Sequence, residues 1–419
     1  MNSRRPAVIS VCITLFLDSL GIGLIIPVAP KLIEHLQGKQ DTDAAFIFGL
    51  LGSTYAFMQF IFAPVLGSLS DHFGRRPVIL FSLLGSGLDY FAMALSPNLW
   101  WLFITRALNG LTGANFGTAT AYIADITPPE KRPGAFGMAG AAFGFGFIMG
   151  PVTGGYLGGH DLRLPFVVAG AVTILNWLYA LFVLPESLPL DRRRPFALHR
   201  AHPIAALQHL ARYPLVAGLA VVLFLVNLAQ FALHATWTLY TMHRYNWQYR
   251  DVGNSLLLVG LSAAIMQGGL ARRLVPKIGE PRSLLLGLVI GVLAYAGYAF
   301  ATQGWMIYTI IAIASVGAIA QPATQSMITR TVHRDEQGET QGSLTSLSSV
   351  AAILGPLIGA PLFGKFAAKD APFYLPGAPF VAGAVLSLAG LIIAVIVLKR
   401  HAPPPITVQA TEDEPKPAA

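Results

Sequence analysis

Twelve long apolar stretches occupy most of this chain of 419 residues. Each has roughly the 20 residues that a helix needs to cross the hydrocarbon core of a bilayer. They lack the strict alternation of barrel strands, so we expect helices. The sequence therefore predicts an all-α membrane protein of twelve transmembrane helices. These are centred near residues 18, 57, 87, 113, 147, 175, 227, 262, 292, 317, 354 and 389.

The composition is that of a membrane protein, with 54% hydrophobic and only 11% charged residues. A net charge of +8 could suggest a nucleic-acid partner. With both termini placed in the cytoplasm, however, twenty of the 28 Lys and Arg residues fall on the cytoplasmic side, seven on the other side, and Arg106 within a span. The positive-inside rule explains this basicity, so the expected partner is a lipid bilayer and not nucleic acid.

A polar interval at residues 185–214 divides the twelve stretches into two sets of six. We predict an N-terminal six-helix bundle over 1–184, a cytoplasmic linker over 185–214 and a C-terminal six-helix bundle over 215–400. Residues 401–419, which are rich in Pro, Thr and Glu, have no apolar face to bury and are predicted to be a disordered cytoplasmic tail.

An internal repeat supports this division, because an offset of 205 residues aligns several glycines of the two sets. Gly74 falls on Gly279, Gly137 on Gly342, Gly150-Pro151 on Gly355-Pro356, and Gly154 on Gly359. Duplicated halves of this kind place a substrate cavity between them, near the middle of the bilayer. The predicted architecture is therefore two pseudo-symmetric bundles.

Two motifs carry a resemblance to a known family. The loop after the second span contains Gly67, Asp71, Gly74, Arg75 and Arg76 in the spacing G-x-x-x-D-x-x-G-R-R, and the fifth span carries Gly137, Gly146, Gly150, Pro151, Gly154 and Gly155. With these motifs the chain resembles the twelve-span drug:proton antiporters of the major facilitator superfamily. The stretches at 17–30, 110–127 and 143–155 resemble the tetracycline efflux pumps within that branch.

The resemblance implies the major facilitator fold and a bacterial inner-membrane location. It also implies a gate latch of Asp71, Gly74, Arg75 and Asp125, which would hold the two halves together when the pump faces outward. The span-five motif, Gly146, Gly150, Pro151, Gly154 and Gly155, would seal against span eight or its vicinity. Ordinary helix packing is the alternative explanation of that glycine stripe. We expect a monomer that uses protons as the coupling ion and has no cofactor and no metal site of its own.

Three ionisable residues lie deep within predicted spans: Asp18, Asp89 and Arg106. Such residues cost about 2.5–3.5 kcal/mol each even on the lower insertion scales, so they indicate function. We expect Arg106 to pair with one of the two acids, and the surplus carboxylate to carry the proton in competition with a cationic substrate. Asp18 is the first choice for the carrier and Asp89 the second.

Polar side chains suited to a large, oxygen-rich ligand lie along several spans. Any one of these amides could instead make an interhelical hydrogen bond. The predicted cavity residues are Tyr55, Gln59, Asn109, Asn115, Asn227, Gln230, His234, Gln321 and Gln325.

The predicted function is proton-coupled export of an amphiphilic drug, tetracycline-like, by alternating access. Tetracycline pumps usually have an acid in span nine, where residues 283–301 carry no charge; magnesium carried with the substrate would lose a partner there. The alternative is proton-coupled transport of a sugar or other small metabolite on the same fold. An enzyme is not expected, because no span has clustered metal-ligand or nucleophile residues.

Overall fold

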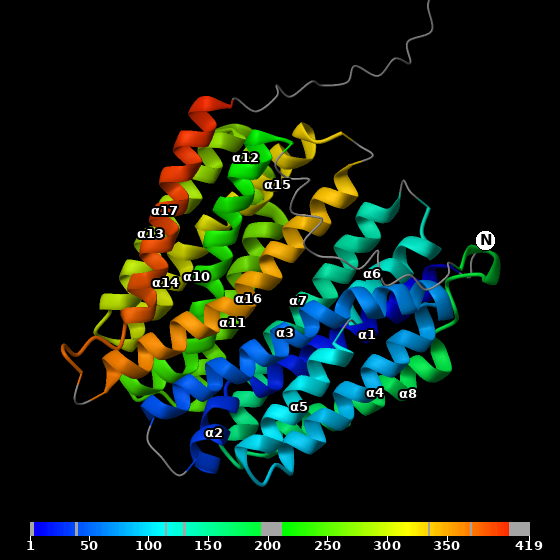
Figure 1. Ribbon diagram of the computed structural model, residues 1–419, viewed down its shortest axis with the longest axis horizontal. Coiled ribbons are helices and arrows are strands. Elements are labelled where there is room, and N and C mark those ends of the chain that lie inside the picture. The colour runs from blue at the N-terminus through cyan, green and yellow to red at the C-terminus, as the bar shows by residue number, and fades with distance from the viewer. Residues whose placement is uncertain are drawn as a thin grey trace, which may run out of the picture.

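A computed structural model describes residues 4–37, 41–113, 115–128, 131–193, 212–333, 336–368 and 371–401. These residues fold into helices joined by short loops, with no strand among them (Figure 1). The predicted all-helical class is therefore confirmed.

The N-terminal half packs α1 against α7 and α8, α4 against α8, and α3 against α5. Its buried apolar side chains form two main clusters within this half. Its helices are α1 (Arg4–Ile25), α2 (Ala29–Gln37), α3 (Asp41–Phe73), α4 (Arg75–Ala94), α5 (Leu99–Thr112), α6 (Asn115–Ile126), α7 (Arg132–Gly158) and α8 (Leu164–Val183), followed by the short η2 (Leu190–Arg192).

The C-terminal half packs α10 against α16 and α17, and α13 against α17 and α15. Its helices are α10 (Pro214–Tyr245), α11 (Tyr249–Ile265), α12 (Ala271–Ile278), α13 (Glu280–Phe300), α14 (Gly304–Val316), α15 (Ala320–Thr331), α16 (Gln337–Ala367) and α17 (Ala378–Arg400), with the short segments η4 (Met266–Leu270) and η5 (Gly317–Ile319).

Ten helical stretches in the described part of the chain are long and apolar enough to cross a membrane. The other two predicted spans, the fourth and the eighth, are interrupted. The fourth consists of α5 and α6, which are separated at Gly113, and the eighth of α11 and α12, which are joined by the π-helical η4. Irregular backbone at membrane depth is tolerated where protein buries it or where it lines a cavity.

The predicted repeat has matching local structure in the two halves. Gly74 and Gly279 are the two glycines of the described residues with positive φ, at 107° and 87°, and each directly precedes a helix. A side chain is strained at such angles, which explains the glycine at both positions. Gly150 and Gly154 pack on α1, just as Gly355 and Gly359 pack on α10.

The two halves meet where α3 packs on α16 and α7 packs on α11. On α3, a Cβ at Gly49 would lie 2.6 Å from the Ala360 side chain of α16, whereas one at Gly67 would meet nothing within 4 Å. Gly67 lies about five helical turns from Gly49 on the same face of α3. The halves therefore touch at the end that contains Gly49, here called the closed end, and diverge toward the end that contains Gly67, here called the open end.

The second contact between the halves shows the same divergence. Gly155 of α7 lies against the backbone of Tyr249, and Ile148 lies against Gly260 of α11. Gly144 and Gly137 continue the Ile148 face of α7 toward the open end, and a Cβ at either would meet nothing within 4 Å.

Two domain predictions fall largely outside the described residues. Residues 194–211 of the predicted linker and 402–419 of the predicted tail are not among them. The boundaries at 185, 214 and 401 stay predictions.

Candidate functional site

Asp89 is buried in the second half of α4, with 5% of its surface exposed. Its Oδ2 accepts a hydrogen bond of 2.8 Å from Nδ2 of Asn109 on α5. Its Oδ1 is buried and has no hydrogen-bond partner among the described residues. Burial of a charged carboxylate oxygen without a hydrogen-bond donor costs free energy. A proton bound to that oxygen removes the charge and with it most of this cost.

Arg106 does not form the direct ion pair that the sequence suggested. Its Nη2 lies 3.0 Å from the sulfur of Met93, and no described carboxylate lies within ion-pair distance of it. The register of α4 against α5 explains the difference. Asn109 lies opposite Asp89, so Arg106, one turn earlier on α5, lies opposite Met93, one turn later on α4. Its charge still acts on Asp89 through space.

Asp18 lies on α1 and is also buried, with 7% exposed. The charges of Asp18, Asp89 and Arg106 all act on the ring hydroxyls of Tyr55 and Tyr90. The three predicted coupling residues, from three different helices, therefore surround one polar region within the N-terminal half.

A side chain of α3 hydrogen-bonds the backbone at the interruption of the fourth span. Nε2 of Gln59 donates a 2.7 Å hydrogen bond to the carbonyl oxygen of Gly113, where α5 ends, and lies 3.2 Å from the Tyr55 hydroxyl. Three predicted cavity residues, Tyr55, Gln59 and Asn109, thus lie around this interruption. Asn115 begins α6, and its side chain is outside the described residues.

A second polar group lies on the C-terminal half. Nε2 atoms of Gln230 and His234 are 2.8 Å apart, and the Tyr295 hydroxyl of α13 lies 3.5 Å from Oε1 of Gln230. Gln230 and His234 are exposed near the middle of α10, where contact with lipid would be costly. They therefore line a water-accessible space. Tyr295 was not predicted, because a tyrosine in an apolar run carries no distinct signal.

The remaining cavity predictions are less closely grouped. Asn227 is half-buried one turn before Gln230, while Gln321 and Gln325 are exposed one turn apart on α15. No side-chain hydrogen bond joins these three to other described residues.

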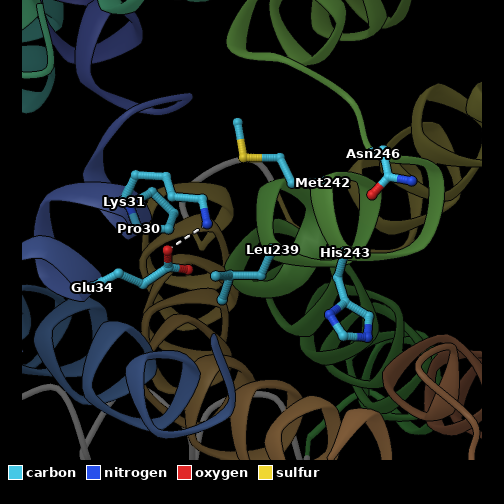
Figure 2. Close-up of a pocket in the computed structure, with 7 residues that line it drawn as sticks. All are labelled: Pro30, Lys31, Glu34, Leu239, Met242, His243 and Asn246. Carbon is cyan, nitrogen blue, oxygen red and sulfur yellow. Dashed lines mark hydrogen bonds and ion pairs between the residues drawn. The ribbon is translucent and has the colours of Figure 1, made fainter. Parts of the chain in front are cut away.

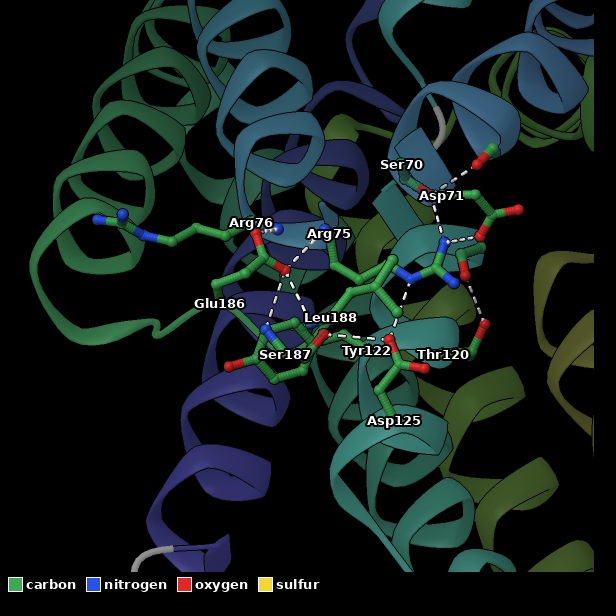
Figure 3. A network of polar contacts seen from close by, with 12 residues as sticks. Ser70, Asp71, Arg75, Arg76, Thr120, Tyr122, Asp125, Glu186, Ser187 and Leu188 are labelled. Atoms are coloured by element: carbon green, nitrogen blue, oxygen red, sulfur yellow. Dashed lines mark hydrogen bonds and ion pairs between the residues drawn. The ribbon is translucent and has the colours of Figure 1, made fainter. Parts of the chain in front are cut away.

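A network of polar contacts lies at the open end, around the start of α4 (Figure 3). Arg75 contacts Asp71 through Nη1 at 2.6 Å and Asp125 through Nε at 3.1 Å. Its Nη1 also donates to the Ser70 hydroxyl at 2.6 Å. Asp125 is the partner that the sequence suggested. All of these residues belong to the N-terminal half, so these contacts do not join the halves in this structure.

The family model described as Major Facilitator Superfamily matches residues 11–356 and 277–419. The chain belongs to the major facilitator superfamily. It is 39% identical over 385 residues to the class C tetracycline resistance protein of Escherichia coli, covering 92% of this chain and 95% of the relative. The class D tetracycline resistance protein of Salmonella ordonez is 36% identical, with 96% and 98% covered.

Among solved structures, the human organic anion transporter MFSD10 (TETRAN) is similar, with a TM-score of 0.70 and 26% identity. The match covers 94% of this chain and 100% of that one. The predicted major facilitator fold, with twelve spans in two halves, is thereby confirmed, and this chain is a multi-pass membrane protein.

The glycine stripe of this major facilitator protein packs differently from the expectation. A Cβ at Gly146, Gly150 or Gly154 would lie within 3 Å of α1, near Phe16, Gly23 and Leu24 respectively. The expectation that the stripe seals against span eight is therefore wrong for these three residues. They recur every four residues and so share the α1-facing side of α7. Gly155 of the motif faces α11, whereas Pro151 has its ring against Gly23 of α1 and its backbone oxygen near Gly253 of α11. The stripe positions the helix that carries Asp18.

Glu186, which sequence reasoning assigned to the linker, belongs to this open-end network. Its carboxylate accepts hydrogen bonds from the backbone N–H groups of Arg75 at 2.9 Å, Arg76 at 3.3 Å and Leu188 at 3.0 Å. The first N–H groups of a helix have no partner within the helix, so an external acid caps α4. An acid directly after an apolar span is the signal that could have found Glu186.

One further cavity, of about 280 Å³, lies near the closed end between α2 and α10 (Figure 2). Lys31 and Glu34 form an ion pair on one side of it, and His243 lies on the other. It is separate from the groups around Asp89 and Gln230.

Proposed function

We propose that this chain is a proton-coupled antiporter that exports an amphiphilic drug, tetracycline-like, across the bacterial inner membrane. The similarity to tetracycline resistance proteins over nearly the whole chain supports drug export. Basic residues at the open end, among them Arg75 and Arg76, support a cytoplasmic location for that end and for both termini. In this arrangement the described conformation faces inward.

The observation that carries proton coupling is the half-satisfied carboxylate of Asp89. With a proton on Oδ1, the group is neutral and its burial is cheap; without it, the group is an anion that favours a cation in the cavity. A proton and a cationic substrate then compete for the same region. Because one leaves when the other binds, the two are transported in opposite directions. The unpartnered oxygen favours Asp89 over Asp18 as the carrier, the reverse of the order suggested by the sequence.

Arg106 has a supporting role in this scheme. It lies beside Met93, close enough to attract the Asp89 carboxylate but not in direct contact with it. A direct ion pair would hold the carboxylate in its charged form. A more distant cation leaves both protonation states accessible, which a carrier requires.

Substrate contacts would come from both halves, from Tyr55, Gln59 and Asn109 on one side and Gln230 and His234 on the other. Magnesium would enter as cargo with a tetracycline. Residues 283–300 of α13 carry no charge, which removes one expected partner of that cation, so an amphiphilic substrate without magnesium is equally compatible with the site.

Uptake of labelled tetracycline into everted membrane vesicles with an imposed pH gradient tests the proposal. We expect accumulation by the wild type, loss of gradient-driven accumulation in Asp89→Asn, and normal accumulation in the control Asp191→Asn, whose side chain is exposed outside the spans. Accumulation by Asp89→Asn at the wild-type rate would contradict the carrier assignment. A pump-deficient host that gains resistance to no drug would favour the metabolite transporter.

A further inference from the structure

The open end has a second ion pair, with a buried acid, which sequence reasoning did not identify. Glu280, the first residue of α13, pairs with Nη2 of Arg330 near the end of α15. The Ser326 hydroxyl donates a 2.6 Å hydrogen bond to Oε1 of the same Glu280. The Glu280 side chain is only 10% exposed.

This pair is the repeat counterpart of the contact between Arg75 and Asp125, with the charges exchanged. The offset of 205 residues that aligns the halves places Arg75 on Glu280 and Asp125 on Arg330. Both pairs span 50 residues, and each begins directly after a glycine with positive φ. The ion pair therefore lies at the same place in both halves, but the basic and the acidic residue have exchanged positions.

The exchange changes how each pair interacts with its helices. A helix N-terminus is partly positive and a C-terminus partly negative. Glu280 at the start of α13 and Arg330 near the end of α15 are both in the favourable place. Arg75 at the start of α4 and Asp125 near the end of α6 are both in the unfavourable place.

The N-terminal pair also has competing partners. Arg75 is shared between Asp71 and Asp125, and Glu186 supplies the acid that the start of α4 lacks. Arg330, by contrast, meets one carboxylate among the described residues. If Arg75 separates from Asp125, other partners can replace that contact. If Glu280 separates from Arg330, the buried Glu280 carboxylate is left without its cation.

We propose that Glu280 and Arg330 form a fixed clamp that holds α13 to α15 in every conformation, while Arg75 exchanges partners. Rearrangement at the open end then takes place mainly in the N-terminal half. Glu280, Arg330 and Ser326 are positioning residues. The proposal rests on the alternating exposure of the proposed function.

The test uses the purified full chain with Cys12→Ala and one introduced cysteine, Gly137→Cys, where added atoms meet nothing within 4 Å. Two quantities are measured for each variant: the melting temperature, and the thiol-labelling rate well below melting. The charge-neutralised variants are Arg75→Gln and Glu280→Gln. Matched controls are Lys131→Gln and Arg282→Gln, whose side chains are exposed near the same end.

We expect Glu280→Gln to lower the melting temperature by several degrees and to leave the labelling rate within about twofold. We expect Arg75→Gln to change the labelling rate severalfold with a smaller thermal effect. Arg330→Lys, which keeps the charge, should lose less thermal stability than Arg330→Gln. If Glu280→Gln does not fold, this Arg330 comparison tests the clamp.

A Glu280→Gln labelling change as large as that of Arg75→Gln, or an unchanged melting temperature in Glu280→Gln, would overturn the clamp. Equal labelling rates in the wild type and Arg75→Gln would overturn the proposal that Arg75 exchanges partners. Failure of the proposed function alone looks different, because these variants would behave as expected while tetracycline is not transported.

Discussion

Asn109 and Asp89 face each other across α5 and α4, and Nδ2 of Asn109 satisfies only one oxygen of the carboxylate, at 2.8 Å. The neighbouring Arg106 is displaced by one turn, onto Met93. The acid therefore has a neutral donor at close range and a cation farther away. This arrangement leaves both charge states of Asp89 accessible, which is the basis of the proposed coupling.

The contact between α7 and α1 should tolerate no side chain at Gly154. A Cβ there would lie 2.0 Å from the backbone oxygen of Leu24, so Gly154→Val must push α1, and with it Asp18, away from α7. Overpacking of this kind costs roughly 1–3 kcal/mol. We expect a lower melting temperature and loss of transport. Gly144→Val, on the open face of the same helix, should remain stable; equal losses in both variants would show that the α1 contact is not the cause.

The interruption of the fourth span depends on Gln59. Gln59→Leu removes the donor to the part-buried Gly113 carbonyl, and an unpaired carbonyl costs about 1–3 kcal/mol when it is buried. We expect the melting temperature to fall by several degrees. Gln325→Leu is the control, because its side chain has no hydrogen bond to the described residues. A Gln59→Leu protein as stable as Gln325→Leu would contradict this role.

Glu186 should stabilise the start of α4. Glu186→Ala removes the acceptor of the Arg75 and Arg76 N–H groups, and loss of a cap costs about 1 kcal/mol. Amide hydrogen exchange at Arg75 and Arg76 should accelerate severalfold, and exchange in the middle of α4 should not change. Asp191→Ala provides the comparison. Unchanged exchange at both amides would remove Glu186 from the network.

The sequence was sufficient to predict the helices, because their apolar length is a physical requirement of the bilayer. It also predicted the two halves, since the glycines of the repeat mark positions of positive φ and close packing. It identified Asp89 and Asn109 as buried polar groups, because charge and amide are rare at that depth.

Interhelical register was beyond the sequence. A helical period shows that Arg106 and Asn109 share one face of α5, but only packing decides which of them lies opposite Asp89. The same limit applied to the glycine stripe, whose partner proved to be α1. Glu186 was assigned to the linker because the chain leaves regular structure there, although its carboxylate folds back onto α4.

The divergence of the halves along α3 predicts unequal access from the two sides. Cysteines at Ser53 and Gly67, each in a Cys12→Ala background, would be labelled in everted vesicles with a membrane-impermeant thiol reagent. Ser53 donates to the Ile353 carbonyl at 2.7 Å and is buried, so Ser53→Cys should react slowly. Gly67→Cys should react at least tenfold faster. Equal rates would mean that the open end is not the more accessible one.

Proton movement driven by substrate is the most direct measurement of the central claim. Purified protein would be reconstituted into weakly buffered liposomes loaded with a pH-sensitive dye, and a tetracycline–magnesium gradient imposed. We predict that protons move in the direction opposite to the substrate, which changes the pH inside the liposomes. This pH change should be absent in Asp89→Asn and retained in Asp191→Asn. A pH change of wild-type size in Asp89→Asn, or tetracycline flux without any proton movement in the wild type, would contradict the account.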